Sequence, residues 1–165
     1  MRIAQAAFGF LVVPYSSWHA DWAYGLPLIV LIVLIHVLGL GLINQRVNSV
    51  ASAAIARRHP TSAFVLLVGT TTLLITILHG TEACICATAY WLLGALPDLR
   101  SATLYSLNAV TSYGHANLSL EAHWQLMGAM EALDGWLVFG LTTAFLFGMM
   151  ERVRLLSSRE GTGSG

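Results

Sequence analysis

Three long apolar stretches divide the chain, with polar segments between and around them. Residues 22–43 are almost continuously apolar, residues 61–96 form a second run, and residues 124–150 form a third. A helix rises about 1.5 Å per residue, so about 20 apolar residues are enough to cross the hydrocarbon core of a bilayer. The pattern therefore predicts three transmembrane helices, the second of them longer than one crossing requires.

The polar segments define the expected topology. Residues 44–60 are predicted to be a loop and residues 151–165 a tail, and both carry arginine. Because arginine concentrates on the cytoplasmic side of membrane proteins, both segments are assigned to the cytoplasm. Residues 1–21 end at an aromatic belt that comprises Tyr15, Trp18, Trp22 and Tyr24. They are expected to form an interfacial segment on the outer side, where residues 97–123 also lie; the alternative is the apolar part of a signal peptide.

The composition agrees with a protein surrounded by membrane lipid. Hydrophobic residues make up 56% of the chain and charged residues 10%, whereas soluble domains carry roughly a quarter of charged residues. The formal net charge is zero, so no attraction to nucleic acid is expected. No catalysis is expected either.

The outer segment between the second and third apolar stretches has an internal pattern of its own. Asp98 is placed to cap a short helix over Leu99–Val110. Thr111–Asn117 is then expected to be extended chain that includes Gly114. The residues of the short helix expected to face neighbouring helices are Leu104, Leu107 and Val110.

Two structures fit this segment. A short helix going in and an extended segment coming out is a re-entrant pore loop, which is tolerated at membrane depth only if protein or a water-filled path surrounds it. The other structure is an ordinary external loop with a helix on the membrane surface. Topology alone leaves both open.

Three stretches around the segment carry further motifs. The chain reads "HGTEACICATAYWLLGALPDL", then "ATLYSLNAVTSYGHAN", then "EALDGWLVFGLTTAFLF". These stretches resemble the small bacterial ion channels of the potassium-channel superfamily. That family has a similar outer-helix end, a pore loop close to "ALYFSLVTYTTLGYGD", and an inner helix containing "EALNG" and "FGWSTAFLF". The resemblance extends from about residue 79 to residue 147.

The resemblance implies an all-α integral membrane protein with a pore domain over residues 61–150. One re-entrant pore helix and filter loop would lie between transmembrane helices 2 and 3. Four copies would form a homotetramer in a bacterial inner membrane, with the N-terminus outside, and conduct K⁺ or another monovalent cation without a cofactor or a structural metal. The filter implied by the motif consists of Thr111, Ser112, Tyr113, Gly114, His115, Ala116 and Asn117.

The filter departs from the family pattern at its outer end. His115 replaces a tyrosine, Ala116 replaces the second glycine, and Asn117 replaces an aspartate. Carbonyls that point at one axis require some left-handed backbone, which alanine adopts at a cost of roughly 1–2 kcal/mol. Weak selectivity for K⁺ over Na⁺ is therefore expected.

Ionisable residues within the apolar stretches indicate a further functional region, because such residues are costly in a membrane. His79 and Glu82 share one helix face, and Glu131 and Asp134 share another. They are interpreted either as a polar shell that supports the pore loop or as groups that bind ions or transfer protons. Gly135 and Gly140 either permit close helix packing or act as a gate hinge.

Two other functions are weighed. Because the filter is altered, the chain could be a non-conducting or regulatory subunit of a related channel. It could also be a haem-binding redox membrane protein, since it has six histidines. His36 and His79 are expected to differ in depth by about 15 Å, which disfavours a haem iron shared between them.

Overall fold

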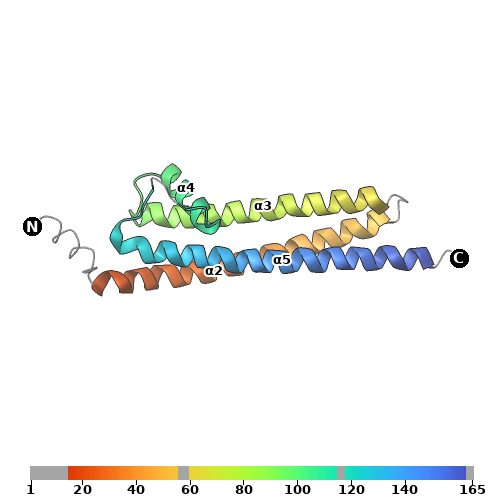
Figure 1. Ribbon diagram of the computed structural model, residues 1–165, viewed down its shortest axis with the longest axis horizontal. Helices are drawn as coiled ribbons and strands as arrows, with labels where there is room; N and C mark the ends of the chain where they lie inside the picture. Colours follow the sequence, from red (N-terminus) through yellow and green to blue (C-terminus); the bar gives the residue numbers. More distant parts are fainter. Residues whose placement is uncertain (1–14, 56–59, 115–117, 163–165) are drawn as a thin grey trace, which may run out of the picture. The chain divides into compact units, whose positions relative to one another are not determined.

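The computed structural model describes residues 15–55, 60–114 and 118–162, and this part of the chain is helical with connecting turns and no strand. Its α-helices are α2 (Tyr15–Ile55), α3 (Pro60–Leu92), α4 (Leu99–Val110) and α5 (Gln125–Thr162), with a single 3₁₀ turn at Ala122–Trp124 (Figure 1). The predicted all-α class is confirmed.

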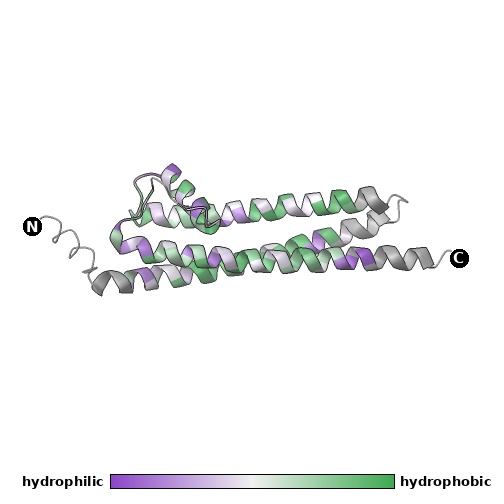
Figure 2. Ribbon diagram, in the orientation of Figure 1, coloured by the Kyte–Doolittle hydropathy of each residue, from purple (hydrophilic) through white to green (hydrophobic). Residues whose placement is uncertain are grey.

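Three of these helices are long and apolar enough to cross a membrane, over His19–Val47, Phe64–Leu92 and Ala122–Arg152. Figure 2 shows hydrophobic residues along each of them. Threonine hydroxyls on these helices find hydrogen-bond partners within the same helix: those of Thr72 and Thr76 donate to the carbonyls four residues before them. Such side chains are compatible with a lipid environment, where no water replaces a missing partner.

Helices α2 and α5 continue beyond the C-terminal ends that the hydropathy pattern predicts. The loop expected over residues 44–60 is wrong for most of its length, because α2 continues to Ile55 and α3 begins at Pro60. Residues 44–59 contain neither Gly nor Pro, so the change from apolar to polar does not interrupt the helix. Similarly, α5 continues through most of the predicted tail to Thr162.

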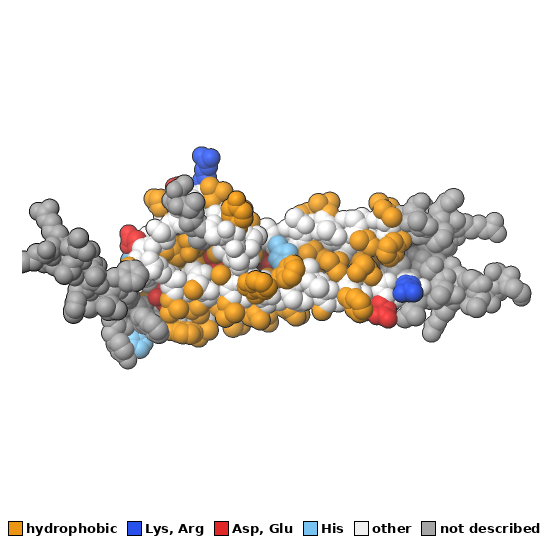
Figure 3. Space-filling view, in the orientation of Figure 1, with side chains coloured by type: hydrophobic (Ala, Val, Ile, Leu, Met, Phe, Trp, Pro, Cys, Tyr) orange, Lys and Arg blue, Asp and Glu red, His pale blue; other side chains and the backbone are white. Residues whose placement is uncertain are grey.

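The chain divides into two compact units, which are described separately. Unit 1 comprises residues 1–33 and 82–136, and unit 2 comprises residues 34–81 and 137–165. The core of unit 2 is apolar and contains Leu40, Ile43, Val47, Leu67, Ile75 and Met149. Large hydrophobic side chains also cover much of the described surface in Figure 3, as expected for helices that face lipid.

In unit 1, the turn between α3 and α4 follows from its sequence. Gly94 has a φ of 70°, and the amide of Ala95 donates to the carbonyl of Tyr90 at 2.9 Å. This is a Schellman cap, in which glycine takes the left-handed position after the helix end. Asp98 then caps α4 by accepting from the Ser101 amide at 2.9 Å. The predicted cap and the predicted bounds of the short helix are both confirmed.

The face of α4 that packs inside the chain differs from the expected one. Its buried residues are Ala102, Tyr105, Ser106 and Ala109, whereas Leu104 and Leu107 are exposed within one chain. The buried face consists mostly of small residues because α4 approaches the other helices of unit 1 closely. Leucine at those positions would hold the backbones further apart.

Replacing Asp98 with alanine is expected to loosen the first turn of α4. The Ser101 amide and hydroxyl both donate to the Asp98 carboxylate and hold its pKa below the usual value. A lowered pKa means that this stabilisation is present above the ordinary pKa of aspartate and is lost as the pH falls through the lowered one. Hydrogen exchange of the α4 amides measures the effect. Ser119→Ala, at an exposed loop position, is the control and should leave that exchange unchanged.

Candidate functional site

One stripe of α5 receives α4 in unit 1. A Cβ atom added at Gly128 would collide with the Tyr105 hydroxyl, and one added at Gly135 would collide with the backbone of Val110. Glu131 lies between these glycines on the same stripe, and its neighbour on α4 is Ser106. A larger residue would therefore displace the Tyr105 side chain at Gly128 and the α4 backbone at Gly135.

Glu131 connects three elements of unit 1 through its carboxyl group. The Tyr90 hydroxyl on α3 donates to Glu131 Oε2 at 2.8 Å. On α4, Ser106 Oγ hydrogen-bonds to Glu131 Oε1 and also lies 2.8 Å from the carbonyl oxygen of Ala83 on α3. All of these side chains are buried. The rings of Tyr90 and Tyr105 meet edge to face, with 5.4 Å between their centroids, so an aromatic contact adds to the polar ones.

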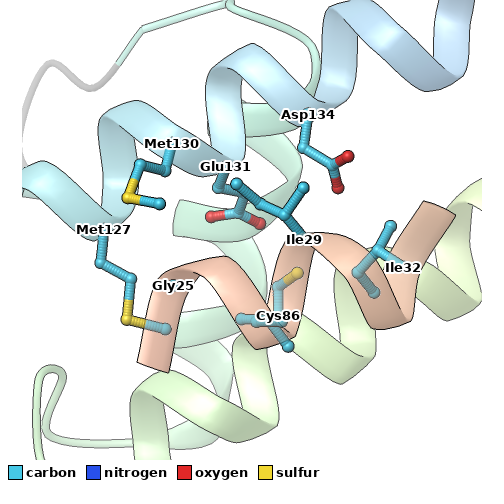
Figure 4. Close-up of a pocket in the computed structure, with 9 residues that line it drawn as sticks. Gly25, Ile29, Ile32, Cys86, Met127, Met130, Glu131 and Asp134 are labelled. Carbon is cyan, nitrogen blue, oxygen red and sulfur yellow. The ribbon is translucent and has the colours of Figure 1, made fainter. Parts of the chain in front are cut away.

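A small pocket lies beside this network, shown in Figure 4. Glu131 and Asp134 reach it from α5 together with two methionines, Cys86 reaches it from α3, and the α2 side of the lining is apolar. The full lining is Gly25, Leu28, Ile29, Ile32, Cys86, Met127, Met130, Glu131 and Asp134.

The segment that follows α4 begins with a turn, so the extended chain expected from Thr111 is wrong at its start. Thr111 has helical dihedral angles and Ser112 has a φ of 53°. The amide of Tyr113 donates to the Asn108 carbonyl at 3.0 Å, which makes a second Schellman cap with serine in the left-handed position. The hydroxyl of Ser112 accepts from the Trp136 indole at 3.1 Å.

The rest of the predicted filter is described in part. Tyr113 and Gly114 are exposed within one chain, and Gly114 has a φ of 89°. His115, Ala116 and Asn117 lie outside the described residues. Within Thr111–Gly114, the part of the predicted filter that the structure describes, Ser112 and Gly114 have left-handed backbone.

Unit 2 contains a second polar cluster. Thr142 Oγ1 on α5 lies 3.1 Å from His36 Nε2 on α2 and 3.1 Å from His79 Nε2 on α3. The two imidazole rings have centroids 5.1 Å apart. The expected depth difference between these histidines is therefore wrong. It rested on placing His79 near the outer end of its helix, whereas α3 continues for another 13 residues, to Leu92.

Thr142→Val is expected to destabilise this cluster, because a methyl group replaces the hydroxyl that bridges both imidazoles. The hydroxyl has one proton, so it donates to one ring and accepts from the other. Hydrogen bonds between membrane helices contribute roughly 0.5–2 kcal/mol each. Thermal unfolding in detergent should show a lower midpoint for Thr142→Val. Thr142→Ser keeps the hydroxyl and should retain the original midpoint; equal losses in both variants would contradict a bridging role.

The predicted polar residues have different surroundings. Glu131 hydrogen-bonds to α4, Asp134 lines the neighbouring pocket, and Glu82 is buried in unit 1. His79 instead hydrogen-bonds to Thr142 within unit 2. Gly135 packs against Val110, while an added Cβ at Gly140 meets no atom within 4 Å. Tyr90, Ser106 and Thr142 were not predicted from the sequence, although the spacing of Gly128, Glu131 and Gly135 on one helix face is a signal of a packed stripe.

Comparisons with family models, curated proteins and solved structures find no match to this chain. The fold itself defines the class at a coarse level. The chain has three helices suited to crossing a membrane and a shorter helix between the second and third of them. These features indicate a membrane protein.

Proposed function

We propose that the chain is the subunit of a tetrameric cation channel of potassium-channel type, in which α4 is a re-entrant pore helix. The filter is formed by the seven residues from Thr111 to Asn117 of each subunit. The channel resides in a bacterial inner membrane and lets monovalent cations move down their gradient. The polar shell behind the pore helix includes Glu131.

The depth of α4 along α5 is the observation that carries the proposal. The candidate span on α5 begins at Ala122, so Gly135 lies about 20 Å further along the helix axis. The last residue of α4, Val110, packs against Gly135, while Tyr105, earlier on α4, packs against Gly128. The short helix therefore runs deeper along α5 as its own chain proceeds. A helix on the membrane surface would keep both contacts at one depth.

The charge distribution of α4 suits a cation pathway. The C-terminal end of a helix carries about half a negative elementary charge. Thr111, Ser112, Tyr113 and Gly114 follow that end and are exposed within one chain. Four such ends around one axis would stabilise a cation in a low-dielectric cavity, and exposed backbone carbonyls would replace its hydration shell.

The orientation follows from arginine. Arg46 lies at the C-terminal end of the candidate span on α2, and Arg152 and Arg154 lie at or just beyond the C-terminal end of the span on α5. Arg152 hydrogen-bonds to Asn44 Oδ1 at 3.4 Å within unit 2. The positive-inside rule then places α4 towards the outer side.

Ion flux into liposomes tests the proposal. Purified protein is reconstituted, and K⁺ uptake is compared with Na⁺ uptake and with protein-free vesicles. We expect flux of both ions with a weak preference for K⁺, because Ala116 disfavours the left-handed backbone of a selective filter. Strong K⁺ selectivity would contradict the role given to Ala116. Absence of flux would favour the alternative of a non-conducting subunit that requires a related channel as partner.

The oligomeric state provides an independent test. One pore loop per chain cannot enclose a pore, so native mass spectrometry in a mild detergent should show tetramers. Monomers or dimers alone would contradict the proposal. An absorption spectrum of the purified protein tests the haem alternative: a Soret band would support haem, and its absence after haem supplementation would exclude that alternative.

A further inference from the structure

The hydrogen bonds around Glu131 require more protons than the hydroxyl groups supply. Three contacts join four groups: Tyr90 to Glu131 Oε2, Ser106 to Glu131 Oε1, and Ser106 to the Ala83 carbonyl. Each hydrogen bond needs one proton between its two oxygens. Tyr90 and Ser106 contribute one each, and a carbonyl contributes none. The third proton must belong to the carboxyl group of Glu131.

With that proton in place, every contact is satisfied. The Glu131 hydroxyl donates to Ser106 Oγ, Ser106 donates to the Ala83 carbonyl, and Tyr90 donates to the other Glu131 oxygen. An ionised Glu131 would compete with Ala83 for the single proton of Ser106. One of the two contacts would then be an oxygen–oxygen approach without hydrogen, which is repulsive.

The surroundings of Glu131 also favour a neutral group. The titratable side chains around it are acidic or weakly acidic and cannot compensate a negative charge. Among the described residues of unit 1, the one Lys or Arg is Arg100, which is exposed. An ionised carboxylate buried without a nearby cation is strongly unfavourable. The facing groups are Cys86 and Tyr90 on α3, Tyr105 on α4 and Asp134 on α5, while the pocket lining from α2 is apolar. A further acidic group, Glu82, interacts with Cys86.

We propose that Glu131 is a neutral carboxylic acid that donates its proton to Ser106, and that this proton fastens α4 to α3 and α5. Loss of the proton to hydroxide breaks one contact of Ser106 and leaves a charge behind α4. In the channel proposed above, on which this consequence rests, α4 then shifts and conduction falls at alkaline pH. Glu131 is thus a positioning residue for the pore helix.

Infrared spectroscopy tests the protonation state without reference to ion conduction. The protein is reconstituted in lipid, and the carbonyl stretch of a protonated carboxylic acid is compared between the original chain and Glu131→Gln. We expect a band that Glu131→Gln removes and that persists at neutral pH. Glu121→Gln, at an exposed glutamate, is the control and should leave the band unchanged. The proposal is overturned if Glu131→Gln alters only carboxylate bands.

Stability of the variants discriminates between the two protonation states. A glutamine amide donates through nitrogen and accepts through oxygen, as the neutral acid does, so Glu131→Gln should unfold within a few degrees of the original chain. If Glu131 were ionised, it would accept from both partners, and glutamine would lose one contact. Glu131→Ala, which can do neither, should unfold at a clearly lower temperature. Equal losses in the glutamine and alanine variants would contradict the neutral acid.

Flux measurements separate this inference from the function. The original protein should lose conduction as the pH rises through the range in which the acid band disappears, whereas Glu131→Gln should conduct at alkaline pH. If Glu131→Gln removes the acid band but the protein shows no flux at any pH, the channel proposal is refuted and the protonated state of Glu131 is supported. Flux that falls identically in both proteins would refute the regulatory role of Glu131.

Discussion

Alanine at Gly135 is expected to destabilise the protein, whereas alanine at Gly140 is expected to stabilise it. An added Cβ at Gly135 collides with the Val110 backbone, which cannot move aside as a flexible side chain can. Overpacking of this kind costs roughly 1–3 kcal/mol. At Gly140 no atom within the chain lies within 4 Å of the added Cβ, and alanine is favoured over glycine in a helix by roughly 0.5–1 kcal/mol.

Thermal unfolding of both variants in one detergent measures this contrast. The two positions lie on the same helix, but only Gly135 is buried against α4, so the difference between the two variants reports the contact with α4. If Gly135→Ala matched Gly140→Ala, α4 would not approach α5 as described. The flux assay adds a functional readout. Displacement of α4 should reduce conduction in Gly135→Ala more than in Gly140→Ala, unless Gly140 serves as a gate hinge, in which case both variants lose flux.

The second large effect is expected for Ser106→Ala. The substitution removes the hydroxyl that joins α4 to Glu131 and to the Ala83 carbonyl. A buried polar group left without its partner costs roughly 1–3 kcal/mol, and here the carboxyl of Glu131 loses one. Alanine lacks the hydroxyl oxygen of serine and adds no heavy atom, so no clash contributes to the loss.

The same unfolding assay measures Ser106→Ala. Ser119→Ala, at an exposed position, is the matched control and should leave the midpoint unchanged. Combining Ser106→Ala with Glu131→Ala, which removes the carboxyl group, tests the coupling directly: if the two side chains interact, the double variant should lose less than the sum of the two single losses. Additive losses would show that Ser106 and Glu131 act independently.

The local signals in the sequence predicted α4 well. Its cap at Asp98 and its end at Val110 depend on neighbouring residues, so composition and spacing are sufficient to place them. The end of α2 was not predictable in the same way. Hydropathy reports where the chain leaves an apolar environment, and the helix continues to Ile55 because nothing in that stretch interrupts it.

The candidate site was predicted in part. Glu131 and Asp134 stand out because carboxyl groups are rare in apolar helices. Ser106 and Tyr90 carry no comparable signal, since serine and tyrosine are common in such helices and their partners are distant in sequence. The bridge between His36, Thr142 and His79 depends on the register between three helices. An apolar pattern identifies the buried face of a helix, but it does not say how far the helix is shifted along its axis relative to its neighbours. Small errors in the predicted helix ends therefore placed His36 and His79 at different depths.

Recordings of single molecules in a planar lipid bilayer test the central claim most directly. Purified tetramers are incorporated between solutions of unequal KCl concentration, and the current is measured as the voltage is varied. The proposal predicts discrete current steps whose reversal potential shows that cations carry the current, and fewer or smaller steps for Gly135→Ala. Electrically silent bilayers that contain verified tetramers, or currents carried by anions, would contradict it.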